Sequence, residues 1–329
     1  MSKTKKGSVL IAVLWSLFFL AMLAVAINSY VRPQLEFSSR FSNGAKMYYI
    51  ARAGVQRAIF EAENDATADY DSLYDSWSAN DAAFGNASFG GGTFSVVKPV
   101  PAGESVPTYG LTDEESRINI NKAPRDVLKN LFEKEALAET GEAEAIADSI
   151  LDWIDEDDSL HKEGKEDDYY RSLGDPYPCK NGPFDAVEEL LLVAGVTRER
   201  FDKIKDIITI YGAGTVNINT AGSRVLQALG LSRDAAESII SFRSGQNTKK
   251  EGEVPDNVFT DASTIAEILN KAGVSDQGAD ITRAAVMLGV KSDNFRGVVK
   301  GSLAREGRSE SITFVYDRSE GIIKYWREG

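Results

Sequence analysis

The amino-acid sequence predicts an α+β fold in which one long N-terminal helix packs on an antiparallel sheet and a large all-helical domain is inserted into a loop of that sheet. Three observations support this expectation. An uncharged apolar run near the N-terminus continues as an amphipathic helix, β-forming segments flank a long helical block, and one motif occurs twice within that block. The length of 329 residues also exceeds the ~150 residues of a typical single domain.

The N-terminal helix is expected over residues 8–63, after a short basic leader at residues 1–7. No charged residue occurs from Ser8 through Val31, and about 20 apolar residues at 1.5 Å rise cross a ~30 Å hydrocarbon core. Beyond Pro33, apolar residues recur three or four positions apart, which is the period of an amphipathic helix. The lysines of the leader favour a cytoplasmic N-terminus.

Two plainer interpretations of the apolar run are a cleaved secretory signal and a simple membrane anchor. The run is longer than a usual signal core, and no small-x-small cleavage site closes it. A simple anchor does not predict the amphipathic continuation. The sequence therefore favours a membrane helix that extends into a folded body.

The sheet is expected to come from two parts of the chain. Residues 64–120 contain the segment FGGGTFSVVKPV and a second cluster of β-formers between Tyr109 and Ile120. Residues 291–329 contain three strand-like segments, FRGVVKGSLAREG, SITFVYD and GIIKYWRE, separated by glycine or charged turns. The helical block of residues 121–290 is therefore expected to be an insertion between these two parts.

The helical block contains an internal repeat. The segment ININKAPRDVLKNL from Ile118 recurs as VNINTAGSRVLQAL from Val216, and each copy is followed by a further helix. Such units resemble SAM-like or helix-hairpin-helix modules, which pack in most proteins and bind DNA backbone in some. The turns that start at Val193 and Ala228 each contain one glycine, whereas a phosphate-binding hairpin usually has two. We therefore expect a packing role.

Composition excludes several functional classes. The net charge of −13 disfavours binding to nucleic acid or anionic lipid. The single cysteine, Cys179, cannot form an internal disulfide, and the single histidine, His161, leaves no partner for a His-rich zinc site. The sequence also has no Ser-His-Asp set and no phosphate-binding loop. We therefore expect a protein that is not an enzyme.

An acidic stretch follows the first copy of the repeat. Twelve carboxylates lie between Glu142 and Asp168, against two lysines. A solvated surface is the common explanation for such a run. Calcium binding is the alternative, because calcium takes about six to eight oxygen ligands, although the EF-hand spacing is absent. The candidate calcium ligands are Asp152, Asp155, Asp157, Asp158, Glu166 and Asp168.

The N-terminal region resembles a type IV prepilin or a type II secretion pseudopilin. The shared features are a short basic leader that ends in Gly7 and an uncharged helix that starts at Ser8 and becomes amphipathic. The resemblance implies that a prepilin peptidase cleaves between these two residues and that the new N-terminus undergoes methylation. Most relatives carry Glu as the fifth residue after the cleaved Gly, but this chain has Ala12. In lacking this Glu and in its large size, the chain resembles the general secretion pathway protein K family of minor pseudopilins.

A second region resembles the same family. The segments ILDWIDEDD and KNGPFDAVEELLLVAGVT, with a G-x-E-x-x-YY motif at residues 164–170 between them, are similar to the protein K secretion domain. This resemblance implies a type IV pilin-like body and calcium in the helical domain.

The family resemblance implies a function, a location and partners. The implied function is a structural subunit that caps the tip of a periplasmic pseudopilus in type II protein secretion. The implied partners are I- and J-type minor pseudopilins, the pseudopilus fibre, the prepilin peptidase and the inner membrane, with no nucleic acid. The implied location is the bacterial inner membrane, crossed once, with a cytoplasmic N-terminus and most of the chain in the periplasm.

Two features of the helix bear on that role. Ala12 is expected to specify the tip, because it lacks the carboxylate that would receive the N-terminal amine of a subunit above. The amphipathic face around Val55 and Ile59 is expected to pack on the sheet, and the exposed face near Phe41, Tyr48 and Val55 that the sheet does not cover is expected to contact partner subunits.

A membrane-anchored DNA receptor of the competence type is the alternative. The helix-hairpin-helix of such receptors also begins with a segment similar to VNINTA, followed by a helix similar to residues 234–243. Such receptors are small and basic and lack both the pilin helix and the second repeat. The length and acidic charge of this chain therefore favour the secretion subunit.

Overall fold

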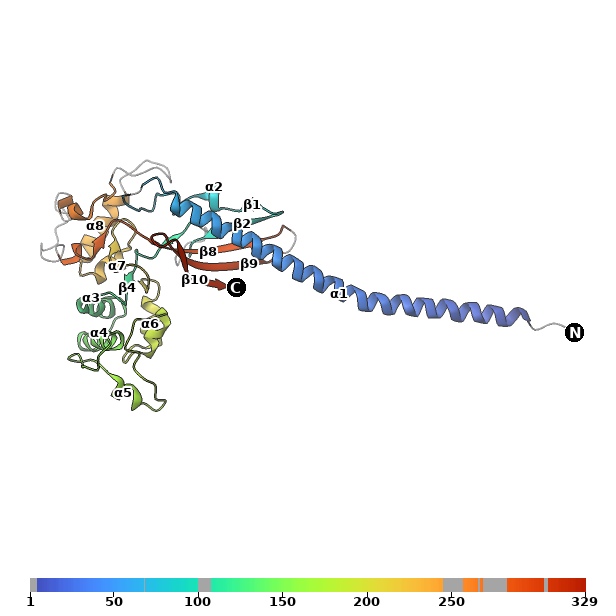
Figure 1. Cartoon of the computed structure of the whole chain (residues 1–329), viewed down its shortest axis with the longest axis horizontal. Helices are drawn as coiled ribbons and strands as arrows, with labels where there is room; N and C mark the ends of the chain where they lie inside the picture. The colour runs from blue at the N-terminus through green and yellow to red at the C-terminus, as the bar shows by residue number, and fades with distance from the viewer. Residues whose placement is uncertain are drawn as a thin grey trace.

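The computed structural model describes residues 5–67, 69–99, 108–244, 257–265, 267–268, 283–304 and 307–329. One helix, α1 (Lys5–Glu63), extends far from the rest of the molecule and ends on a sheet. The other helices lie mainly beyond the far end of that sheet, away from the N-terminus (Figure 1). The expected α+β fold, with a long helix on an antiparallel sheet, is confirmed.

The two halves of α1 have different surroundings. Its outer half is exposed, and it is the one helix among the described residues that is long and apolar enough to span a membrane. Pro33 lies inside the helix, which continues to Glu63. The inner half buries a stripe of residues three or four positions apart: Met47, Ile50, Ala51, Val55, Ala58 and Ala62. The amphipathic pattern thus places the inner half on the sheet.

One expectation about α1 is wrong. Val55 does not lie on a face open to partner subunits, because it is fully buried against the sheet, and Tyr48 is half-buried. Phe41, one helical turn beyond the body, is exposed. The 3.6-residue period places these residues on a common stripe, but it does not indicate where along the stripe the sheet ends.

The sheet is antiparallel and has strand order β1-β2-β8-β9-β10, with β3 also paired to β8. Its strands are β1 (Ala87–Phe89), β2 (Gly92–Val97), β3 (Thr112–Asp113), β8 (Asn294–Ser302), β9 (Ser309–Asp317) and β10 (Ile322–Glu328), and the short helix α2 (Asp81–Phe84) precedes β1. The chain leaves the sheet after β3 and returns at β8. The intervening segment is therefore inserted between two neighbouring strands.

The inserted segment carries most of the short helices. They are α3 (Arg125–Asn130), the π-helical turn η1 (Leu131–Glu135), α4 (Thr140–Ile154), α5 (Asp167–Arg171), the 3₁₀ helix η2 (Val187–Leu192), α6 (Arg198–Ile204), α7 (Ser223–Ala228), α8 (Arg233–Ser244) and the 3₁₀ helix η3 (Ala262–Thr264). Their apolar faces form a core separate from the one under α1.

The inserted segment is not all-helical, contrary to expectation. Two parallel pairs of two-residue strands occur in it, β4 (Ile118–Asn119) with β5 (Ile208–Thr209) and β6 (Val216–Asn217) with β7 (Leu288–Gly289). Strands this short give no alternation that sequence can display. Each pair joins the start of one repeat copy to a strand about 70 to 90 positions later in the chain.

The two copies of the sequence repeat make the same hydrogen bonds in the structure. Asn121 of the first copy holds the backbone of Phe184, donating from Nδ2 to its carbonyl at 3.0 Å and accepting from its N–H at 2.7 Å. Asn219 of the second copy makes the same pair of bonds to Phe259, at 2.8 and 3.0 Å. The two copies are therefore the starts of two similar modules, and the second Asn of each motif has a packing role.

A buried polar junction joins the sheet to the second module. Asp113 Oδ2 accepts hydrogen bonds from Thr220 Oγ1 at 2.5 Å and Ser292 Oγ at 2.7 Å. Glu115 accepts from the backbone and side chain of Asn294 and shares a hydrogen bond with Asp113. Burial raises the pKa of Asp113, and burial followed by the nearby charge of Asp113 raises the pKa of Glu115 to about 9. The buried pair therefore holds a proton more tightly than free carboxyl groups do.

The stability of the protein is expected to fall as pH rises from about 4.5 to about 9, because the folded protein keeps a proton on Glu115 that the unfolded chain releases near the ordinary pKa. Glu115→Gln removes the titrating group and should flatten this part of the profile. Denaturant unfolding of the detergent-solubilised chain across that range measures it, with the exposed Glu188→Gln as the control. An equal pH dependence in both variants would contradict the assignment.

Candidate metal centre in the acidic loop

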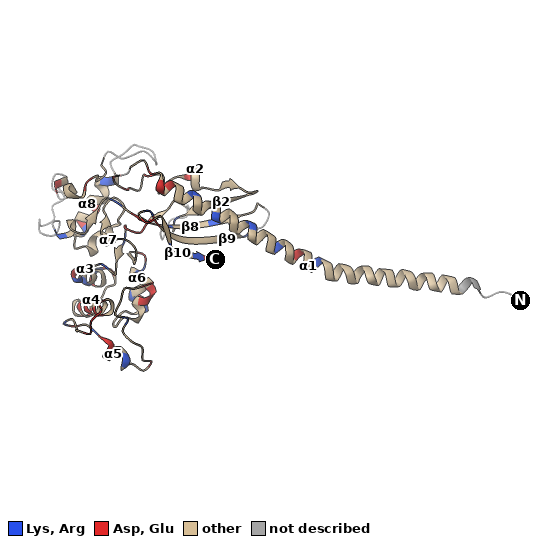
Figure 2. Cartoon of the chain, viewed as in Figure 1, with Lys and Arg blue, Asp and Glu red and all other residues tan. Residues whose placement is uncertain are grey.

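The acidic stretch forms the end of α4, a loop and the start of α5. Figure 2 shows acidic residues along α4 and in the adjoining loop, far from the uncharged outer half of α1. Asp148 and Asp152 lie one turn apart on α4, and both are completely buried. The loop after α4 folds back so that its backbone contacts both side chains.

Asp148 has a structural partner. The guanidinium of Arg125, from α3, forms a bidentate pair with its carboxylate, and the N–H of Glu163 donates to Oδ2 at 3.1 Å. The hydrogen bond from Arg125 is the main cause that lowers the pKa of Asp148. Its charge is therefore compensated within the protein.

Asp152, Asp155 and His161 come together at the end of α4. One potential ligand atom from each lies within 4.8 Å of the others. Asp152 Oδ1 accepts from the N–H of His161 at 3.0 Å and lies 2.5 Å from its Nδ1, while Asp155 Oδ2 is 3.8 Å from the same nitrogen. This geometry offers two carboxylates and one imidazole to a cation.

In the part of the chain that the structure describes, several carboxylate oxygens in and beside this group are buried without a hydrogen-bond partner. They are Asp152 Oδ2, Asp155 Oδ1 and both carboxylate oxygens of Glu166. Burial, followed by the charge of Asp152, raises the pKa of Glu166 to about 7, and burial, followed by the charge of Asp157, raises the pKa of Asp155. Burying unpaired carboxylates is costly. A bound hard cation would provide the missing partner.

Gly164 allows the loop to close on Asp152. A side chain at this position would overlap the carboxylate of Asp152, so that carboxylate would have to move for the loop to keep its approach to α4. The glycine of the G-x-E motif therefore has a steric role, in addition to the role of Glu166.

The six predicted ligands fall into two groups. Asp152, Asp155 and Glu166 are the members with buried, unpartnered oxygens. Asp157, Asp158 and Asp168 are exposed. Asp157 accepts from the N–H of Ser159 at 2.8 Å, and Asp158 accepts from Asn181 at 3.2 Å, while its charge contributes to the raised pKa of Glu166.

Sequence reasoning missed His161 as a member of the group, because a lone histidine cannot make a His-rich zinc site. Its position nine residues after Asp152, inside the acidic stretch, is the available signal.

Comparison with known proteins identifies related chains. Residues 109–213 match the family model described as type II secretion system, protein K. A curated relative, the type II secretion system protein K of Pectobacterium carotovorum subsp. carotovorum, is 33% identical over 114 residues. That match covers 33% of this chain and 33% of the relative, so the chain spans about a third of the curated relative's length in the match.

A solved structure has the same fold. It is the GspK-GspI-GspJ complex from the enterotoxigenic Escherichia coli type 2 secretion system, with a TM-score of 0.62 and 18% sequence identity. The likeness covers 91% of this chain and 99% of that chain. The likeness therefore extends well beyond residues 109–213.

Proposed function

We propose that this protein, whose residues 109–213 belong to the type II secretion protein K family, is a minor pseudopilin that caps the tip of a periplasmic pseudopilus. Its role is structural and not enzymatic. Its location is the inner membrane, crossed once by the outer half of α1, with most of the chain in the periplasm.

The position of the inserted modules carries this proposal. They lie beyond the end of α1 that is farthest from the membrane span (Figure 1). In a fibre built from bundled helices of this kind, another subunit would have to stack at that end. Two packed modules occupy the space, so the chain fits the last position of a fibre.

Ala12 supports the same position. No charged residue occurs from Ser8 through Val31, so the outer half of α1 offers no carboxylate to the N-terminal amine of a subunit above. Leaving that amine unpaired in a helix bundle would cost on the order of several kcal/mol. A subunit at the tip meets no such amine.

The proposed partners are I- and J-type minor pseudopilins, by analogy with the similar solved complex, in which GspK is joined to GspI and GspJ. The exposed apolar residues on α1 just outside the body, Leu35, Phe37 and Phe41, offer a surface for their helices. Co-purification with the neighbouring prepilin-like proteins tests the proposal. Self-polymerisation of this chain, without association with those proteins, would indicate a major subunit instead.

Phe41→Glu is expected to weaken that association at least about tenfold, which is about 1.4 kcal/mol, because a carboxylate would replace an apolar contact. Leu160→Glu is the matched control, since Leu160 is also a large exposed apolar residue but lies in the acidic loop. Equal binding by both variants would exclude this face of α1 from the interface.

Cleavage is expected between Gly7 and Ser8, on the cytoplasmic side, where the basic leader meets the apolar helix. Mass spectrometry of the protein from its native membrane should find a chain that starts at Ser8. Gly7→Leu should retain the leader, because a bulky residue would not enter a peptidase site shaped for glycine. Retention of Met1 in the wild type would contradict the assignment.

We also propose that the acidic loop binds calcium through Asp152, Asp155 and Glu166, with His161 beside them. The buried, unpartnered oxygens support this choice. The ion would compensate carboxylate charge and tie the loop to α4.

The DNA-receptor alternative has less support. The module that includes α4 and α5 carries the acidic stretch, which would repel a phosphate backbone. We expect no shift of duplex DNA at low salt.

A further inference from the structure

We propose a second cation site, formed by Asp65, Asp71 and Asp75 between the end of α1 and the sheet, that takes a hard divalent cation such as calcium. It lies outside residues 109–213, the part of the chain that matches the protein K family. It does not depend on the proposed secretion function or on the acidic loop.

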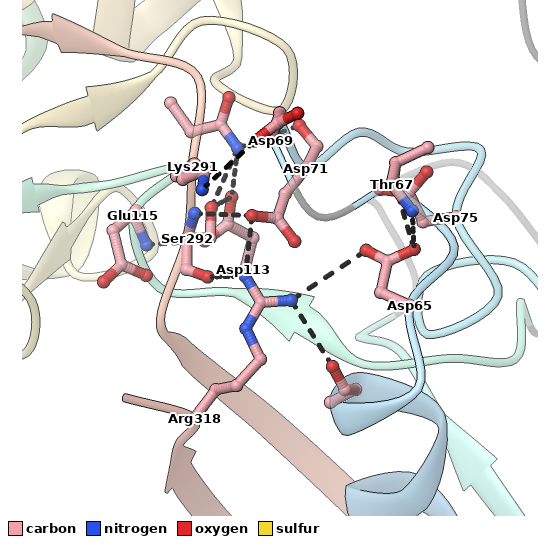
Figure 3. A network of polar contacts seen from close by, with 12 residues as sticks. Asp65, Thr67, Asp69, Asp71, Asp75, Asp113, Glu115, Lys291, Ser292 and Arg318 are labelled. Carbon is pink, nitrogen blue, oxygen red and sulfur yellow. Dashed lines mark hydrogen bonds and ion pairs between the residues drawn. The ribbon is translucent and has the colours of Figure 1, made fainter. Parts of the chain in front are cut away.

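The site lies where three segments meet (Figure 3). Asp65 follows α1 by two positions, and Asp71 and Asp75 lie in the segment that leads to α2. One potential ligand atom of each carboxylate lies within 4.8 Å of the others. The N–H of Ser292, just before β8, donates to Asp71 Oδ2 at 2.8 Å, so the group also contacts the start of that strand.

The protein supplies only part of the charge that these carboxylates need. Arg318 donates to Asp71 Oδ2 at 2.8 Å and lies 3.9 Å from Asp65 Oδ2. Asp75 accepts from the backbone and hydroxyl of Ser72, at 2.6 and 3.1 Å, and neither group carries charge. One guanidinium thus pairs with two of the three carboxylates.

Two buried oxygens in the group have no hydrogen-bond partner among the described residues. They are Asp65 Oδ2 and Asp71 Oδ1. The side chain of Asp71 is 1% exposed and that of Asp65 is 6% exposed, so bulk water does not solvate them. Buried carboxylate oxygens that accept no hydrogen bond from the described protein groups are suited to bind a cation.

A proton alone does not meet this need. Burial is the main cause that raises the pKa of Asp71 to about 7 and that of Asp75 to about 6. A proton on Asp71 would remove one of the three negative charges. A divalent cation held between the carboxylates would compensate two.

The ligand chemistry is that of a hard cation. All three side chains offer carboxylate oxygen, and the nearby hydroxyls of Thr67 and Ser72 are oxygen as well. Oxygen-only groups favour calcium or magnesium over zinc and copper. The irregular loop suits calcium, since calcium tolerates uneven geometry and water in the remaining positions. Binding would fasten the end of α1 to the segment that holds Asp71 and Asp75 and, through the bond from Ser292 to Asp71, to the start of β8.

Calorimetric titration of the full-length, detergent-solubilised chain with calcium tests the site. Asp152→Asn with Asp155→Asn removes the ligands of the acidic loop, and one binding event should remain in that background. Adding Asp65→Asn and Asp75→Asn should weaken the remaining event at least tenfold. Asp69→Asn is the matched control, because Asp69 lies in the same loop with its side chain 95% exposed, and it should leave binding unchanged.

Two results would overturn the proposal. One is the loss of all calcium binding in the Asp152→Asn, Asp155→Asn background. The other is unchanged binding after Asp65→Asn and Asp75→Asn. Asp71 is left intact because it is paired with Arg318, and a melting curve of each variant identifies any that does not fold. If the double variant does not fold, Asp65→Asn alone gives the test, since Arg318 still pairs with Asp71. If the acidic loop binds no calcium, the wild type should show a single calcium-binding event. Asp65→Asn should still weaken that event.

Discussion

Asp152→Asn is expected to lower stability far more in calcium than in chelator. In chelator, the variant should melt near the temperature of the wild type, because it removes a buried charge whose Oδ2 has no partner but weakens the pair of Asp152 with His161. With calcium present, the variant should melt below the wild type, because it loses a ligand of the ion. A ligand at about 100 times its Kd stabilises a protein by about 2.7 kcal/mol.

The matched control is Asp157→Asn. Asp157 lies in the same loop but is exposed and is bonded to the backbone of Ser159, so its substitution should change the calcium response little. Thermal melting of the full-length chain, in chelator and in excess calcium, measures both variants. If Asp152→Asn keeps the full calcium response, the acidic loop is a solvated surface and the metal proposal for it is wrong.

The internal comparison of the two modules explains why the first one carries the acidic site. The sequence ADSILDWI at residues 147–154 aligns with AESIISFR at residues 236–243. Trp153 stacks on Phe184 at 6.4 Å between ring centroids, and Phe242 lies 5.2 Å from Phe259 in the second module. Ser241 stands where the first module has Asp152. The second module therefore keeps the aromatic pair but has no carboxylate at the position of Asp152.

The sequence was sufficient to predict which stretch carries the acidic site, but not which carboxylates face inward. Glu166 and Asp168 are two positions apart and chemically similar, yet Glu166 is buried and Asp168 is exposed. The direction in which α5 starts decides between them, and no periodicity marks a helix of five residues. The capture of Asp148 by Arg125 across 23 positions is likewise a result of packing α3 on α4.

The same division applies to the fold. Apolar periodicity predicted α1, and β-forming segments predicted β8, β9 and β10, because those elements are long enough to show a pattern. How closely α1 approaches the sheet depends on single glycines. Sequence alone does not tell a glycine that permits contact from one that ends a strand.

Gly301→Ala is expected to displace α1 from the sheet. Gly301 lies in β8 directly under the helix, and an added Cβ would overlap the carbonyl oxygen of Met47 and come 2.5 Å from the backbone nitrogen of Ala51. Backbone atoms cannot rotate away as a side chain can, so the whole helix must move. Such overpacking costs about 1–3 kcal/mol, and occasionally more. The loss should also uncover the apolar stripe that α1 buries.

Gly289→Ala is the matched control, because Gly289 also lies in a strand, β7, and its added Cβ would meet Thr215 at an ordinary 3.5 Å. It should change the free energy of unfolding by less than about 0.5 kcal/mol. Hydrogen exchange in α1 and β8, with thermal melting of the full-length chain, separates local undocking from global loss of stability. We expect faster exchange in the inner half of α1 for Gly301→Ala alone. Equal exchange in the two variants would mean that α1 tolerates a methyl group beneath it, and that the close backbone contact does not hold the helix on the sheet.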